Sequence, residues 1–77
     1  MAVKVKLLAS LGERHDRREA VIDHVPGMRV ADVWDLVTSG AAMAPNTLTA
    51  INFEYCRRDA AVADGDEVAF FPPVTGG

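Results

Sequence analysis

The sequence predicts an α+β fold, in which a mixed sheet of four to five strands carries one main helix packed on one face. Three observations support this prediction. Several short segments alternate apolar and polar residues, one segment repeats apolar residues with the period of a helix, and glycine- or proline-containing turns separate the segments. With 77 residues, of which 49% are apolar, the chain is long enough for one small domain with a modest core.

The first predicted strand covers residues 3–8, where apolar residues alternate with two lysines. The side chains expected to face the core are Val3, Val5 and Leu7. Leu8 is expected to lie on the opposite, open face of the sheet. The polar residues 10–18 predict a loop, and residues 19–25 predict a second strand, antiparallel to the first, that ends at a Pro-Gly turn.

One α-helix is predicted after this turn. Its apolar stripe has i, i+3, i+4, i+7 spacing and consists of Val30, Val33, Trp34 and Val37. Asp32 falls in the first turn, where a carboxylate suits the helix dipole, but Arg29 is a poor N-cap, so the first helical residue is not fixed. Ser39-Gly40 predicts the end of the helix, with the glycine in the left-handed cap position. Trp34 is expected to be the largest side chain under the sheet.

The second half of the chain begins with a predicted hairpin. Residues 48–51 are expected to form a third, central strand, and residues 52–54 a tight turn. The turn type is open because Phe53 is poorly suited to positive φ. Residues 55–58 are then expected to form a short edge strand, blunted by its two arginines.

A turn at residues 64–66 precedes the last predicted strand, residues 67–71. Alternation directs Val68 and Phe70 towards the core, and Ala69 and Phe71 outwards. With the first and last strands adjacent and parallel, residues 1–71 would form the β-grasp arrangement of ubiquitin. Leu8 would then lie beside Phe71 on the open face, as an apolar docking surface.

The last six residues are expected to form an extended tail, consisting of Pro72, Pro73, Val74, Thr75, Gly76 and Gly77. The prolines cannot donate to a sheet ladder and therefore end the strand, and the glycines carry no side chains. Such a tail reaches roughly 20 Å and is thin enough to present the terminal carboxylate of Gly77 inside a narrow channel. The alternative is a frayed terminus without a function.

Composition limits the function classes. The net charge of −3 argues against nucleic acid as a partner. The single cysteine excludes an internal disulfide and favours a reducing, cytoplasmic compartment. The sequence contains neither the apolar run of a signal peptide nor a stretch long enough to cross a membrane, so no membrane association is expected.

Catalytic and metal-binding motifs are also missing from the sequence. It contains no glycine-rich phosphate loop, no nucleophile elbow and no paired metal-ligand spacing, so no activity of the chain alone, no metal and no bound cofactor are expected. His15 and His24 lack a second ligand, and Cys56 is expected to be a packing residue. The remaining candidate is the carboxylate of Gly77, which adenylation by ATP would activate for replacement of one oxygen by sulfur.

Residues 64–77 closely resemble the C-terminal signature of the MoaD-like sulfur carriers, the small subunits of molybdopterin synthase in the MoaD/ThiS family. The ending Pro-Pro-Val-Thr-Gly-Gly is the most specific part of this resemblance, and residues 5–9 resemble the first strand of the family. Two positions depart from the family pattern. Leu8 stands where the family usually has an aromatic residue, and Phe53 stands where it commonly has glycine.

The resemblance implies that an ATP-dependent, ubiquitin-activating-type enzyme adenylates Gly77 and that a sulfurtransferase then supplies sulfur to form a thiocarboxylate. The tail would insert into the large catalytic subunit and donate this sulfur to cyclic pyranopterin monophosphate, forming the dithiolene of molybdopterin. By the same resemblance, the partner channel would be lined by Pro72, Pro73, Val74, Thr75 and Gly76. The docking residues would be Leu8 and Phe71.

Two other functions fit the same sequence. The chain could carry sulfur for another pathway, such as thiamine thiazole formation, cysteine synthesis or transfer-RNA thiolation. It could also be a ubiquitin-like interaction module whose tail is never activated, or one that is conjugated to lysines. The sequence leaves open whether the free chain is a monomer or part of a heterotetramer.

Overall fold

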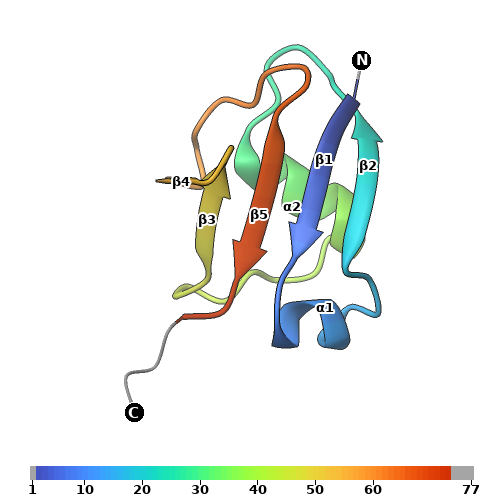
Figure 1. Ribbon diagram of the computed structural model, residues 1–77, viewed down its shortest axis with the longest axis vertical. Helices are drawn as coiled ribbons and strands as arrows, with labels where there is room; N and C mark the ends of the chain where they lie inside the picture. Colours follow the sequence, from blue (N-terminus) through green and yellow to red (C-terminus); the bar gives the residue numbers. More distant parts are fainter. Residues whose placement is uncertain (1, 74–77) are drawn as a thin grey trace.

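The computed structural model describes residues 2–73, and in this part of the chain five strands form one mixed sheet in the order β2-β1-β5-β3-β4 (Figure 1). The elements are β1 (Ala2–Leu7), α1 (Ser10–Arg14), β2 (Glu19–Asp23), α2 (Val30–Thr38), β3 (Leu48–Ile51), β4 (Glu54–Cys56) and β5 (Glu67–Phe71). Strands β1 and β5 are parallel neighbours, and the other three pairs are antiparallel. This topology confirms the predicted β-grasp arrangement.

The core lies between the sheet and α2, which crosses behind the sheet in Figure 1. The strands contribute the inward side chains that alternation predicted, namely Val3, Val5, Leu7, Val68 and Phe70, all of them buried. The helix contributes the predicted stripe of Val30, Val33, Trp34 and Val37. Because each such side chain stabilises the fold by about 1.5–3 kcal/mol when it is fully buried, this layer holds the domain together.

Trp34 is central to this core, as predicted. Its ring meets that of Phe70 in a T-shaped contact, with ring centroids 5.1 Å apart. The indole N–H donates to the carbonyl oxygen of Ala41 at 2.7 Å, so the polar atom of this buried side chain is satisfied. The contact therefore ties the loop after α2 to the core.

The two ends of α2 are stabilised differently. At the start, the Asp32 carboxylate accepts the backbone N–H of Arg29 at 2.9 Å, which compensates for the poor capping side chain of Arg29. At the end, the expectation that glycine takes the left-handed position is incomplete, because Ser39 already has φ 57°. Gly40 follows with φ 81° and donates its N–H to the carbonyl of Asp35 at 2.9 Å, as in a Schellman motif.

Residues 10–18 are not entirely a loop, because α1 occupies Ser10–Arg14. The loop prediction was wrong here since five residues are too few to show a helical period. Leu11 and Gly12 are nevertheless buried. A β-carbon added to Gly12 would lie 2.7 Å from the carbonyl oxygen of Leu7, so glycine lets α1 lie close against the end of β1.

Three strand predictions need correction. Strand β2 ends at Asp23, two residues early, and the turn that follows contains Gly27 with φ 84°. Strand β4 starts at Glu54, one residue earlier than predicted, and ends before the arginines. Strand β1 covers Ala2–Leu7 and not residues 3–8, so Leu8 lies just beyond it.

The central position predicted for β3 is confirmed, because β3 pairs with β5 on one side and β4 on the other. Propensity could not predict that β5 is the middle strand, because pairing between distant strands decides the order.

The β3–β4 hairpin has a two-residue turn, since Ile51 pairs with Glu54. Its central residues, Asn52 and Phe53, have φ values of 50° and 70°. Positive φ at both positions is what a type I′ turn requires, and this resolves the turn type that the sequence left open.

Within residues 2–73, no helix is long and apolar enough to cross a lipid bilayer.

Candidate functional site

The face of the sheet that α2 leaves uncovered carries a shallow, largely apolar hollow of about 340 Å³. It is lined by Lys6, Leu8, Ala50, Phe53, Tyr55, Glu67, Ala69 and Phe71, and is called the open-face hollow below. Its walls come from β1, β3, β4 and β5 and from the β3–β4 turn. Segments from both ends of the chain therefore build one surface.

Strand register brings Leu8 and Phe71 together. Leu7 pairs with Phe70 across the parallel β1–β5 ladder, and the N–H of Leu8 donates to the carbonyl of Phe70 at 2.9 Å. The next residue after each of these, Leu8 and Phe71, therefore lies on the open face, and Leu8 has 43% of its surface exposed. The structure thus has the adjacency that the sequence predicted for these two residues, both in the open-face hollow.

Tyr55 extends the apolar surface from Phe71 towards β4. The two rings lie with their centroids 5.7 Å apart and tilted by 47°. Tyr55 is 73% exposed, whereas Phe71 is half-buried, so the outer ring of this pair is mostly in solvent. Exposed large apolar side chains that gather in one place indicate a surface for a protein partner.

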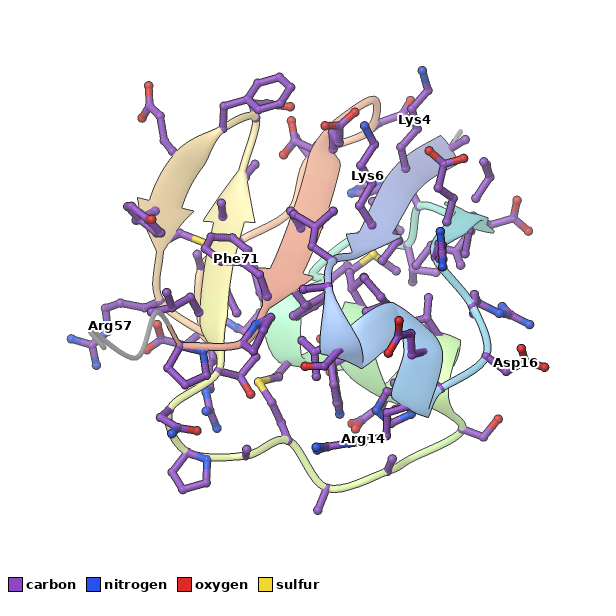
Figure 2. All side chains as sticks on the ribbon, turned by 60° about the horizontal axis from the view of Figure 1, so that its bottom comes forward. Lys4, Lys6, Arg14, Asp16, Arg57 and Phe71 are labelled. Carbon is purple, nitrogen blue, oxygen red and sulfur yellow. The ribbon has the colours of Figure 1, made fainter. Side chains whose placement is uncertain are left out.

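The charges of the open-face hollow cancel. Of the described residues that line it, Lys6 and Glu67 are charged, and their side-chain atoms Nζ and Oε2 lie 3.9 Å apart. Figure 2 shows Lys6 projecting from β1 and Phe71 near the carboxyl end of β5. A partly exposed pair at this distance adds little stability, but it leaves the hollow nearly neutral.

The root of the predicted tail lies at one end of the hollow. Strand β5 ends at Phe71, and the half-buried Pro72 and Pro73 follow it without strand structure. The remaining predicted tail residues, Val74, Thr75, Gly76 and Gly77, lie outside the described residues.

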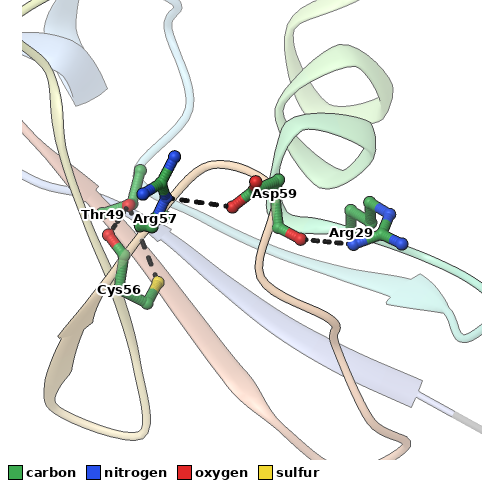
Figure 3. A network of polar contacts seen from close by, with 5 residues as sticks. All are labelled: Arg29, Thr49, Cys56, Arg57 and Asp59. Carbon is green, nitrogen blue, oxygen red and sulfur yellow. Dashed lines mark hydrogen bonds and ion pairs between the residues drawn. The ribbon is translucent and has the colours of Figure 1, made fainter.

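A second, more polar hollow adjoins the first, and Tyr55 lines both. It contains the only cysteine of the chain (Figure 3). The hydroxyl of Thr49 donates to the carbonyl of Cys56 at 2.7 Å, and the half-buried thiol of Cys56 lies 3.6 Å from that hydroxyl. These contacts fit the predicted packing role of Cys56.

The arginines beside this cysteine are largely used in surface contacts. Arg57 forms an exposed ion pair with Asp59 at 3.4 Å, and Arg29 donates to the carbonyl of Asp59 at 2.6 Å (Figure 3). Arg58 donates to the carbonyl of Ala44. Among residues 2–73, no group of three histidine, cysteine, aspartate or glutamate side chains is placed to hold a metal ion.

Sequence reasoning named Leu8 and Phe71 but missed Phe53 and Tyr55. Alternation along the short edge strand could have placed Tyr55 outwards. For Phe53 the available signal is that a large aromatic residue is poorly suited to positive φ, which indicates a role outside the turn itself. Neither residue could be assigned to the hollow without the strand order.

A β-grasp fold with an apolar open face at the root of its C-terminal segment places this chain in the ubiquitin-like class of small proteins. SAMP1 of Haloferax volcanii, a small archaeal modifier protein, has the same fold, with a TM-score of 0.83 and 27% identity over the full length of both chains. The chain belongs to the ThiS family, which it matches over residues 5–77.

Two curated relatives carry a more specific name. The molybdopterin synthase sulfur carrier subunit of Haemophilus influenzae is 42% identical over 59 residues, and that of Escherichia coli is 41% identical over 60 residues. The alignments cover 77% of this chain and 65% of each relative, which is just under two thirds of their length.

Proposed function

We propose that this chain is the sulfur-carrier small subunit of molybdopterin synthase. The observation that carries the proposal is the position of Phe71. It is the last residue of β5, it lines the apolar open-face hollow, and the Pro-Pro-Val-Thr-Gly-Gly ending follows it directly. The names of the two curated relatives support the same function. In this proposal residues 1–71 are the β-grasp body, residues 72–77 are the tail, and Gly77 carries the sulfur.

The first step activates the terminal carboxylate. One oxygen of Gly77 attacks the α-phosphorus of ATP on a separate adenylating enzyme, which forms an acyl adenylate and releases pyrophosphate. The outer sulfur of a cysteine persulfide on a sulfurtransferase then attacks the acyl carbon, and AMP leaves with the original oxygen. A thiol cleaves the S–S bond of the resulting acyl disulfide and forms a mixed disulfide with the sulfurtransferase cysteine. The product is a thiocarboxylate, and the chain itself contributes neither a bound cofactor nor a catalytic side chain.

The second step takes place in the large catalytic subunit. The thiocarboxylate sulfur forms a carbon–sulfur bond with a side-chain carbon of cyclic pyranopterin monophosphate as a carbon–oxygen bond of that carbon breaks, and the oxygen leaves with the phosphate or as water. Water then cleaves the acyl–sulfur bond and regenerates the carboxylate of Gly77. The dithiolene needs two sulfur atoms, so two loaded tails are consumed for each product. Gly76, Thr75, Val74, Pro73 and Pro72 would lie in the channel of the partner.

The body of the domain would position the tail. The open-face hollow would dock Leu8 and Phe71 on the large subunit, so that the roughly 20 Å tail starts at the mouth of the channel. A heterotetramer of two small and two large subunits and a location in the reducing cytoplasm belong to the same proposal.

The test is the intact mass of the chain after incubation with its activating enzyme, ATP and a sulfur donor. We expect the gain that corresponds to replacement of one oxygen by sulfur, and a return to the starting mass when the large subunit and cyclic pyranopterin monophosphate are added. Omitting ATP should prevent the gain, and deletion of Gly77 should abolish sulfur transfer.

Two results would contradict the proposal. An unchanged mass, with an enzyme that is active on another carrier, would exclude a carrier role. A thiocarboxylate that forms but is not consumed by the large subunit would instead point to another sulfur pathway.

A second candidate function is conjugation to lysines, which the modifier name of the H. volcanii neighbours favours. In that case the activated Gly77 would form an isopeptide bond with a lysine amine and release AMP. Mass spectrometry of cell extracts would then find Gly77 attached to lysine side chains of other proteins.

A further inference from the structure

Phe53 combines two features that both oppose the stability of the isolated chain. It has φ 70° at the second position of a type I′ turn, where glycine is favoured and a β-carbon crowds the backbone. Its side chain is also 87% exposed, so it buries little apolar area. The nearby rings of Tyr55 and Phe71 contact each other, but Phe53 is not part of that aromatic pair.

The position of Phe53 suggests what it is for. It lines the same open-face hollow as Phe71, but at the opposite end. Leu48 pairs with Phe71, whereas Ile51, at the start of the turn, pairs with Val68. The two pairs are three residue steps apart along β3, so Phe53 lies about 10 Å or more from the tail root along the sheet.

The hollow also indicates the chemistry of the occupant. Its charged residues, Lys6 and Glu67, pair with each other, and the rest of its lining is mostly apolar. An uncharged, apolar surface is therefore the complement. The hollow runs without a break from Phe71 to the turn at Phe53, so a partner that is seated on Phe71 can also contact Phe53.

We propose that Phe53 is a specificity-determining anchor, which inserts into an uncharged apolar depression on the large catalytic subunit. The identity of this partner rests on the proposed function. Because Phe53 lies at the end of the hollow away from the tail, it contributes to binding of the partner and not to the reaction at Gly77. The strained turn is kept because it presents this ring to the partner.

The experiment compares binding and stability in the same variants, using the unmodified full chain and the purified large subunit. Phe53→Gly and Phe53→Asn remove the ring with residues that tolerate positive φ. We expect the Kd for the large subunit to rise about tenfold, as for loss of an aromatic anchor, while the melting temperature stays the same or rises. Phe53→Tyr keeps an aromatic ring, so its Kd for the large subunit should stay within about threefold of that of the original chain.

Two control variants separate this role from general effects. Leu36→Ala removes another exposed apolar side chain, 57% exposed on α2, outside the hollow. Ser39→Gly relieves positive φ at the end of α2 without changing the hollow. Both should bind the large subunit like the original chain. In Phe53→Gly, the maximal rate of sulfur transfer at a saturating concentration of the large subunit should be unchanged. Only the KM of the variant for the large subunit should rise.

Several outcomes would overturn the inference. Binding of Phe53→Gly within about twofold of the original chain would exclude an anchor, as would an equal loss in Leu36→Ala. A fall in the melting temperature of Phe53→Gly would assign the ring to folding. If the original chain did not bind the large subunit, the occupant would be wrong. The thiocarboxylate mass test of the proposed function is independent of all these measurements.

Discussion

Phe70 and Phe71 are identical neighbours in the sequence with opposite environments. Phe70 points under α2, is fully buried and contacts Trp34, whereas Phe71 points to the open face and shares a hollow with Leu8 and the exposed Tyr55. The difference follows from the pleat of a strand, which directs successive side chains to opposite faces. One face of β5 therefore stabilises the domain, and the other is available to a partner.

The largest expected effect of a substitution lies on the covered face. Phe70→Ala should lower the free energy of unfolding by about 3–5 kcal/mol, because it removes a buried ring and leaves a cavity beside Trp34. A domain of this size has a total stability of only about 5 kcal/mol, so thermal or urea unfolding should show a severe loss.

Phe70→Leu offers a milder form of the same test, since it keeps most of the apolar volume. It should remain folded with a reduced melting temperature and bind the large subunit normally. Weaker binding by a well-folded Phe70→Leu would mean that the two faces are not separate in function.

An intermediate effect is expected where α1 meets the end of β1. Gly12→Ala should destabilise the domain by about 1–3 kcal/mol, because the new β-carbon would lie 2.7 Å from the carbonyl oxygen of Leu7. In an exposed helix the same change stabilises by about 1 kcal/mol. Urea unfolding therefore tests the contact by the sign of the change in the free energy of unfolding. A Gly12→Ala variant more stable than the original chain would disprove the close contact.

The smallest effect on stability is expected on the open face. Phe71→Ala should lower the free energy of unfolding by about 1–2 kcal/mol, since Phe71 is only half-buried and also loses its contact with Tyr55. Its Kd for the large subunit should nevertheless rise about tenfold, as measured by calorimetry. Phe71→Leu is the matched control and should lose less affinity. If Phe71→Ala bound the large subunit as tightly as the original chain, the open face would not be part of the interface.

Local sequence determined much of this protein. The alternation of residues fixed which side chains of β1 and β5 face the core, and the spacing from Val30 to Val37 fixed the buried stripe of α2. These patterns work because each reports the geometry of one element. The terminal Pro-Pro-Val-Thr-Gly-Gly signature indicated the family in the same local way, without reference to the strand order.

The tertiary structure decided what local patterns could not. Parallel pairing of Leu7 with Phe70 joins the two ends of the chain and makes β5 the middle strand, and this pairing brings Leu8 beside Phe71. The turn at Phe53 completes the same hollow from the middle of the chain. Such contacts depend on which distant strands pair, and no period along a single strand encodes that choice.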